Sequence, residues 1–267
     1  MSLAVFRHTL RQNRVTLPVI AGAMVVWGTL MPIIYSTFGV TLRDIINQFP
    51  VLEQFMQFGG GNIFTLPGSV ALGFIHPIAI ALLAVYAIAY PLSGVAGERQ
   101  RGTLEIVLAR PVSRLRYMFT LFVAGALFVS VAMAATLVGT AIGAGAMGVL
   151  GELRVENLPL LWLHGTLLYL AILAIALAMS VSFDRMAPAA SITLAIVLIS
   201  YFLQVLGSLW PDAAWLQEYS LFFYLKPEKV LVEGIQPLDL ALLAVVALVA
   251  IAYARLVFPR RDLAAPA

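Results

Sequence analysis

The chain has 267 residues, of which 62% are hydrophobic and 11% are charged, and its mean hydropathy is +0.98. A soluble domain needs about a quarter of its residues charged to cover its surface. The composition therefore excludes a soluble protein and predicts a membrane protein, whose apolar residues face lipid or one another. The chain contains no cysteine, so it has neither a disulfide framework nor a thiolate metal site.

Residues 1–15 are predicted to form an amphipathic helix at the membrane surface. Leu3, Phe6 and Leu10 recur at helical spacing, and Arg7 and Arg11 lie on a neighbouring face. A basic anchor that binds anionic lipid would have the same pattern, so both interpretations stay open. The apolar run that follows is too long for a signal peptide and lacks a cleavage pattern, and we expect it to be retained as the first span.

Six apolar segments are long enough to cross a membrane, since a helix of about 20 residues spans about 30 Å of hydrocarbon. They cover residues 17–38, 66–96, 117–150, 158–183, 187–209 and 238–258. The sequence therefore predicts an all-α membrane protein in which residues 1–267 form a single transmembrane domain with six transmembrane helices.

The basic residues are distributed unequally among the loops. Twelve Lys and Arg residues lie before the first span, between spans two and three or four and five, or at and after the end of the sixth, whereas four lie in the other loops. Loops rich in Lys and Arg face the cytoplasm. We therefore expect both termini to be cytoplasmic, in a multi-pass protein of the plasma or inner membrane of a prokaryote.

Two connectors on the predicted outer side, residues 41–65 and 210–236, are long enough to contain structure. The first has apolar residues at helical spacing before a break at Gly59–Gly61. The second mixes aromatic and charged residues, as is typical of headgroup depth. Short helices that anchor the protein at the interface are expected in the first, and surface anchoring without a substrate role is the simplest interpretation of both.

The predicted spans lack the groups that catalysis or ion coupling uses. Asp239 and Arg255 lie near the ends of the last span, and His76 and His164 are expected to be satisfied interface histidines rather than proton relays. The histidines lack metal-ligand spacing, and there is neither a phosphate-binding loop nor a serine nucleophile with a placed base. The sequence thus predicts no catalytic residue, no metal site and no enzyme activity of its own.

Two features of the spans concern helix packing. Gly139 and Gly143 stand four residues apart, a spacing that lets helices approach closely, either within the bundle or between two copies of the chain. Pro91 removes a backbone hydrogen bond late in the second span, where we expect a kink.

The most specific signal is GERQRGTLEIVLARPVSRLRY, residues Gly97–Tyr117, between the second and third spans. The positive-inside rule, by which cytoplasmic loops are rich in Lys and Arg, explains its arginines but not the order of its other residues. Thr103 is predicted to cap a helix of about two turns that has Glu105 in its first turn and ends at Pro111. A short amphipathic helix of this kind suits docking into a partner's groove.

This stretch resembles the E-x-E-x-G-T-L-E-x-L-L-x-x-P-V-S-R segment of type 2 ABC exporter permeases, six-span subunits that pair with a separate ATPase. Gln100 departs from the pattern, because many relatives carry an acid there. The length and the predicted topology of the chain also fit this family. The residues that match are Glu98, Gly102, Thr103, Leu104, Glu105, Pro111, Val112, Ser113 and Arg114.

The resemblance implies that residues 97–116 form a cytoplasmic coupling segment, which rests on the ATPase and transmits its closure to the spans. Glu98 and Glu105 would pair with basic residues of the ATPase, and Leu104 with its apolar neighbours would fill a hydrophobic cleft. Arg114 and Arg116 are expected to meet lipid phosphates. The N-terminal helix, with Phe6, Arg7 and Arg11, would also lie close to the ATPase.

The resemblance further implies two copies of an ABC ATPase, a second permease copy, identical or related, and membrane lipids as partners. ATP and magnesium would bind to the ATPase, and no cofactor to this chain. We expect export of an amphipathic or lipophilic compound, and nucleic acid is not an expected partner, since the arginines follow topology. An ion-coupled secondary transporter, a membrane scaffold without transport activity and an intramembrane enzyme stay open as alternatives.

Overall fold

The computed structural model describes residues 3–48, 62–109 and 112–261. Within these ranges all regular elements are helices, and six of them are long and apolar enough to cross a membrane, which confirms the predicted all-α membrane fold. The six candidate spans are Thr16–Gly39, Pro77–Gln100, Arg114–Ala146, Val155–Ser182, Met186–Leu209 and Pro237–Arg260.

The helices follow one another along the chain in an order that alternates long spans with short connecting helices. The long elements are α2 (Thr16–Gln48), α5 (Pro77–Leu92), α8 (Arg114–Ala146), α9 (Leu158–Ser182), α10 (Met186–Leu209) and α12 (Pro237–Val257). The short ones are α1 (Leu3–Gln12), α4 (Leu66–Ile75), η1 (Ser93–Gly97), α6 (Glu98–Gln100), α7 (Leu104–Leu108), η2 (Leu150–Glu152), η3 (Val155–Asn157), η4 (Pro211–Tyr219), η5 (Leu221–Tyr224), α11 (Pro227–Glu233) and η6 (Phe258–Arg260).

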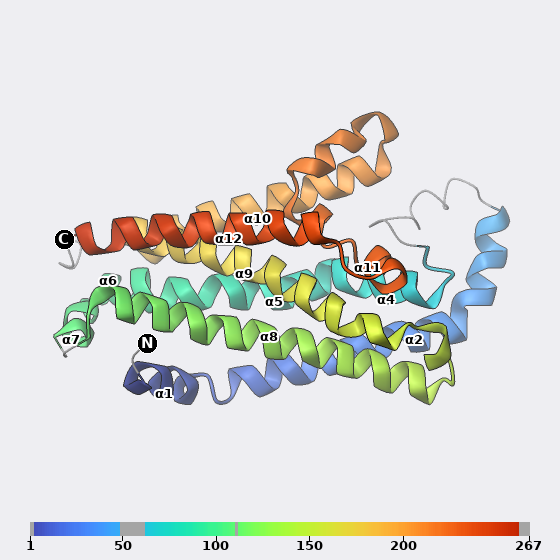
Figure 1. Cartoon of the computed structure of the whole chain (residues 1–267), viewed down its shortest axis with the longest axis horizontal. Coiled ribbons are helices and arrows are strands. Elements are labelled where there is room, and N and C mark those ends of the chain that lie inside the picture. The colour runs from blue at the N-terminus through green and yellow to red at the C-terminus, as the bar shows by residue number, and fades with distance from the viewer. Residues whose placement is uncertain (1–2, 49–61, 110–111, 262–267) are drawn as a thin grey trace.

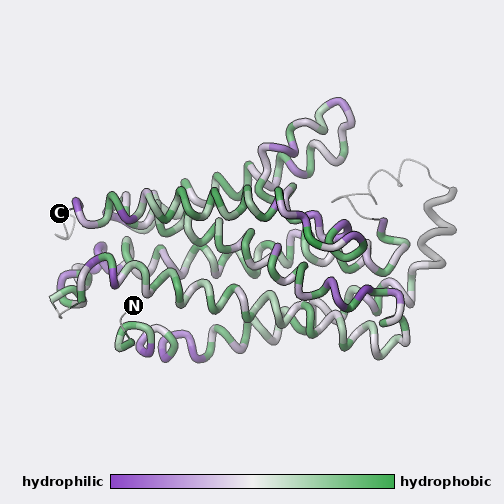
Figure 2. The backbone as a smooth tube through the Cα atoms, viewed as in Figure 1, coloured by the Kyte–Doolittle hydropathy of each residue, from purple (hydrophilic) through white to green (hydrophobic). Residues whose placement is uncertain are grey.

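Helix α9 lies at the centre of the bundle, where it contacts α5, α8, α10 and α12 (Figure 1). Among the six candidate spans, the one that contains α9 has the largest share of buried residues, and the spans in α2 and α12 have the smallest. Hydrophobic residues run along the middle of the bundle and hydrophilic residues gather toward its two ends (Figure 2). Large apolar side chains such as Val26, Phe202 and Leu248 point outward, as expected of a surface that faces lipid.

The second predicted span is two helices rather than one, which corrects the single segment expected over residues 66–96. Helix α4 ends before His76, whose backbone is extended (φ −65°, ψ 138°), and α5 begins at Pro77. Proline disfavours the helical conformation in the residue before it and has no N–H to donate. The His76 ring caps α5 by accepting a hydrogen bond from the backbone N–H of Ile78 (3.3 Å).

His164 is only partly satisfied. Its side chain is fully buried, and Nδ1 lies 2.9 Å from the carbonyl oxygen of Leu160. Nε2 has no hydrogen-bond partner among the described residues. The prediction of a fully satisfied ring is therefore wrong for His164, while its expected place at the membrane interface stays a prediction.

Glycines bring α2 and α8 into backbone contact. A Cβ atom on Gly139 would overlap the carbonyl oxygen of Val25, and one on Gly143 would overlap that of Thr29. Gly28 faces Thr136 in the same way. The glycine pair seen in the sequence thus packs helices within one chain, where close approach strengthens van der Waals contact.

Both connectors at the end of the bundle opposite α7 contain helix. The first continues α2 as far as Gln48, whereas the rest of its predicted apolar pattern and the break at Gly59–Gly61 fall in residues 49–61, outside the described residues. The second connector forms η4, η5 and α11. Helix α11 is tied to α4 and α9, because Glu228 accepts a hydrogen bond from the N–H of Asn62 (3.0 Å) and Asn157 donates to the carbonyl of Leu231 (2.9 Å).

Lys226 secures the second connector to α12. It has a left-handed backbone (φ 39°), and its Nζ lies 2.9 Å from Oδ1 of the buried Asp239.

The Lys226→Ala variant is expected to lower the free energy of unfolding by about 2 kcal/mol, because it leaves a buried carboxylate without its cation. Thermal unfolding in detergent checks this against Lys229→Ala, whose exposed pair with Glu233 is worth less than about 0.5 kcal/mol. Equal unfolding midpoints for the two variants would contradict the expectation.

Candidate functional site

The arginine-rich segments meet at one end of the bundle. Four parts of the chain lie toward this end (Figure 1): helix α1, residues 93–108 from η1 to the end of α7, the connector between α9 and α10, and the C-terminal end of α12. We call residues 93–108 the α6–α7 segment and this end of the bundle the charged end. The sequence predicted that these segments share one side of the membrane, and their location at one end of the bundle agrees with that prediction.

The α6–α7 segment begins with a π-helix. Pro91 cannot donate a backbone hydrogen bond, and α5 passes into η1 two residues later. Ser180 of α9 supplies hydrogen bonds to backbone groups at this change of helix type. Its Oγ donates to the carbonyl of Pro91 (2.9 Å) and accepts from the N–H of Ala96 (3.0 Å). Next to Pro91, where a kink was predicted, the chain therefore forms a π-helix, and a neighbouring span stabilises it.

Glu98 shapes the turn between α6 and α7. Its carboxylate accepts hydrogen bonds from Thr103 Oγ1 and from Arg101 Nη2, each at 2.6 Å. Gly102, between these two donors, has a positive φ of 68°, a conformation that favours glycine. Glu98, Gly102 and Thr103 thus form a turn within the chain.

Helix α7 differs from the predicted helix in length and capping. It has five residues, and Thr103 precedes it without a side-chain capping bond, because the Thr103 hydroxyl is used on Glu98. Arg110 and Pro111, which were expected at its end, lie outside the described residues.

Leu104 and Ile106 point in different directions from α7. Leu104 is fully buried in the core of this chain, whereas Ile106 is 69% exposed and Glu105 is exposed beside it. This corrects the expectation that Leu104 enters a partner's cleft, because its side chain already has a place in its own core. The face of α7 that is free to meet another molecule carries Glu105 and Ile106.

Ser113 and Arg114 hold the start of α8. Ser113 is its N-cap and accepts a hydrogen bond from the N–H of Arg116 (3.3 Å). Arg114 Nη1 donates to the carbonyl oxygens of Pro259 (3.0 Å) and Arg261 (2.8 Å). Arg114 therefore fastens the C-terminal segment and is partly exposed, while Arg116 is exposed; contact of the two with lipid phosphate stays a prediction.

Arg99, Gln100 and Asp184 form contacts that sequence reasoning missed. Arg99 is fully buried, and its Nη1 lies 3.1 Å from Asp184 Oδ1. Gln100 Oε1 accepts a hydrogen bond from the N–H of Met186 (2.9 Å), the first residue of α10. Asp184 is the one acid in the connector between the fourth and fifth predicted spans, and this acid beside Arg185 was the available signal.

Helix α1 confirms the predicted amphipathic pattern at the N-terminus. Phe6 and Leu10 pack against the core, whereas Arg7 and Arg11 are exposed. Leu3, which was assigned to the same apolar face, is 56% exposed. The helix contacts α8, so it lies beside the bundle at the charged end.

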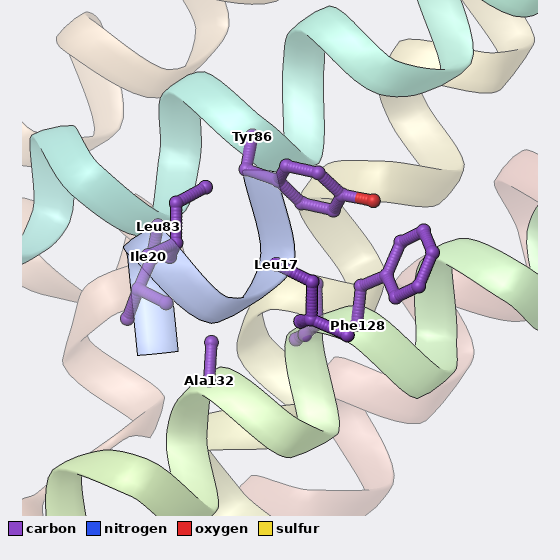
Figure 3. A pocket seen from close by; sticks show the side chains of 7 residues that line it. Leu17, Ile20, Leu83, Tyr86, Phe128 and Ala132 are labelled. Carbon is purple, nitrogen blue, oxygen red and sulfur yellow. The ribbon is translucent and has the colours of Figure 1, made fainter. Parts of the chain in front are cut away.

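An aromatic crevice lies between α2, α5 and α8 (Figure 3). Tyr86 stacks on Tyr90 at 5.6 Å between ring centroids, and both rings meet the edge or face of Phe128. Tyr86 and Phe128 line the crevice itself, and its other lining residues are aliphatic, including Leu17 and Ile20. The crevice offers an apolar surface level with the middle of α8 and no catalytic group. Across the described ranges, no cluster of three or more His, Cys, Asp or Glu side chains could hold a metal ion.

A comparison with known protein families finds one match that covers nearly the whole chain. The family model described as "Multidrug efflux system permease Rv1217c, C-terminal domain" matches residues 6–259. The matched region runs from α1 to α12 and includes the entire α6–α7 segment. No curated protein matches the chain in sequence.

Proposed function

We propose a transport mechanism for this chain, which belongs to the family of the multidrug efflux system permease Rv1217c, C-terminal domain. The chain is a multi-pass membrane permease with six candidate spans. We propose that it is the membrane subunit of an ABC exporter of the type 2 class and that its charged end lies in the cytoplasm. The gathering of the arginine-rich segments at one end supports this orientation, since positive loops face the cytoplasm.

The observation that carries the proposal is the exposed face of α7. In an ATP-driven exporter, a permease subunit without a phosphate-binding loop receives work through a cytoplasmic contact with its ATPase. Helix α7 is seated on the buried Leu104 and presents Glu105 and Ile106 outward at the charged end. An exposed apolar side chain next to a carboxylate suits a groove with a basic rim.

The proposed roles follow from these positions. Glu105 and Ile106 contact the ATPase, while Glu98, Gly102 and Thr103 hold the turn that presents them. Ser113 and Arg114 fix the start of α8, so that displacement of α7 reaches this span. Phe6 anchors α1 on the bundle, and the exposed Arg7 and Arg11 face either the ATPase or anionic lipid.

The transporter would contain two ATPase copies, which bind ATP and magnesium, and two permease copies, identical or related. The cargo would be an amphipathic or lipophilic compound that enters from the lipid phase. The aromatic crevice between α2, α5 and α8 has an aliphatic and aromatic lining, but it is far smaller than a binding site for such a compound.

Substitution of Glu105 tests the assignment. The Glu105→Ala variant is expected to bind the ATPase about fivefold more weakly, since an exposed charge pair contributes up to about 1 kcal/mol. The double variant Glu98→Ala/Glu105→Ala should lose more of the ATPase activity that the permease stimulates, because the turn is also released. ATP hydrolysis by the reconstituted complex measures both effects.

The matched control is Glu156→Ala, an exposed acid at the opposite end of the bundle. All variants should insert into the membrane as the unsubstituted chain does. Full stimulated activity in the double variant would remove Glu98 and Glu105 from the coupling contact.

A further inference from the structure

Three polar contacts join the α6–α7 segment to the connector between α9 and α10, in the same order along both segments of the chain. The backbone N–H of Ala96 donates to Ser180 Oγ, Arg99 pairs with Asp184, and Gln100 Oε1 accepts from the N–H of Met186. We call residues 96–100 and 180–186 together the connector seam. The seam fastens the start of α10 to a segment 85 or more residues earlier in the chain.

Arg99 is the central contact of the seam. A buried guanidinium is costly unless charged or polar groups compensate it, and its rigid planar group fixes where those groups must lie. Because Arg99 is fully buried, the position of α6 fixes its guanidinium, and the Asp184 carboxylate, whose side chain is 55% exposed, lies 3.1 Å from it. Asp184 lies between the last residue of α9, Ser182, and the first residue of α10, Met186.

The seam continues to the end of α12. Oδ1 of Asp184 also accepts a hydrogen bond from Arg261 Nη2, so one carboxylate joins Arg99 to the C-terminal segment. Arg114 holds the same segment through the carbonyls of Pro259 and Arg261. Helix α6 is therefore joined directly to the start of α10 through Gln100 and Met186, and through Asp184 to Arg261, which follows α12.

We propose that Arg99 and Asp184 are positioning residues that make the α6–α7 segment and the start of α10 move as one unit. Helices α10 and α12 are among the least enclosed spans, whereas α9 between them is the most enclosed. Spans with few close neighbours shift with less repacking of the core. This inference rests on the proposed function in one respect: it takes α7 as the helix where the motion begins.

Distance measurements between spin labels test the linkage without an ATPase. The chain has no cysteine, so labels can be placed at Ile106→Cys in α7 and Ala187→Cys in α10, both exposed positions. A reference pair at Val138→Cys in α8 and Val245→Cys in α12, both exposed, reports on the bundle as a whole. The chain is measured in lipid nanodiscs of phosphatidylethanolamine and phosphatidylglycerol.

The α7–α10 pair is expected to give one narrow distance distribution, which Asp184→Asn broadens about twofold because local opening is then permitted. Asp184→Glu should restore the narrow distribution, since it restores the charge. Glu233→Gln, which removes an exposed ion pair at the opposite end, should leave the distribution unchanged.

Two results would overturn the proposal. If Asp184→Asn leaves the α7–α10 distribution narrow, the pair does not link the two elements. If it broadens the reference pair equally, Arg99 and Asp184 stabilise the fold in general and position nothing. Neither result depends on whether the chain binds an ATPase, so failure of the linkage and failure of the proposed function remain distinguishable.

Discussion

The Gly139→Ala variant is expected to lose about 3 kcal/mol of unfolding free energy. An added methyl group would overlap the carbonyl oxygen of Val25, and a backbone atom cannot rotate away as a side chain can. The two helices would have to separate, with loss of the bond from Thr29 Oγ1 to the carbonyl of Gly139 (3.0 Å). Thermal unfolding of the purified protein in detergent measures the loss.

Two other glycines provide controls with the opposite expected sign. A Cβ atom on Gly22 in α2 or on Gly145 in α8 meets nothing within 4 Å. Alanine at either position should be neutral or stabilising by up to about 1 kcal/mol, because alanine favours the helix over glycine. If Gly139→Ala unfolds at the same temperature as these controls, α2 and α8 do not pack as described.

The Ile106→Glu variant is expected to weaken binding of the ATPase by about 30-fold or more. Burial of an isoleucine side chain contributes about 2 kcal/mol or more, and a glutamate in its place adds an unpaired charge. The chain itself should remain folded, because Ile106 is 69% exposed. Titration of the purified chain with the ATPase measures the affinity.

Leu104 and Ile106 allow a matched comparison within one short helix. Ile106→Leu should retain the affinity, since it preserves the apolar contact. Leu104→Ala should instead lower the free energy of unfolding of the chain by about 2 to 4 kcal/mol, because it opens a cavity in the core. Unchanged affinity in Ile106→Glu would place the ATPase contact elsewhere than on α7.

Hydropathy alone was sufficient to predict most of the fold. The lengths of the six apolar runs identified the spans, because a helix must be long enough to cross the hydrocarbon. The spacing of small residues at Gly139 and Gly143 predicted close helix packing, although their partner, α2, became known from the structure. The break at His76 was missed, since the apolar character of the run continues across Pro77.

The candidate site was predictable in location and less so in detail. Residue order in the α6–α7 segment predicted a short helix after Thr103, and α7 begins at Leu104, although it is shorter than predicted and lacks the expected cap. Which side chain of α7 enters the core depends on how the helix lies on the bundle, so the burial of Leu104 could not be read from a five-residue pattern. The pairing of Arg99 with Asp184 joins residues 85 apart, and no local spacing encodes such a contact.

Stimulation of an ATPase tests the central claim most directly. The purified chain and a phosphate-loop ATPase from the same source would be placed together in liposomes, and ATP hydrolysis measured with and without the chain. The proposed function predicts that the two co-purify and that the chain raises the rate of hydrolysis. Failure to retain or stimulate an ATPase, together with transport driven by an ion gradient alone, would contradict it and favour an ion-coupled secondary transporter.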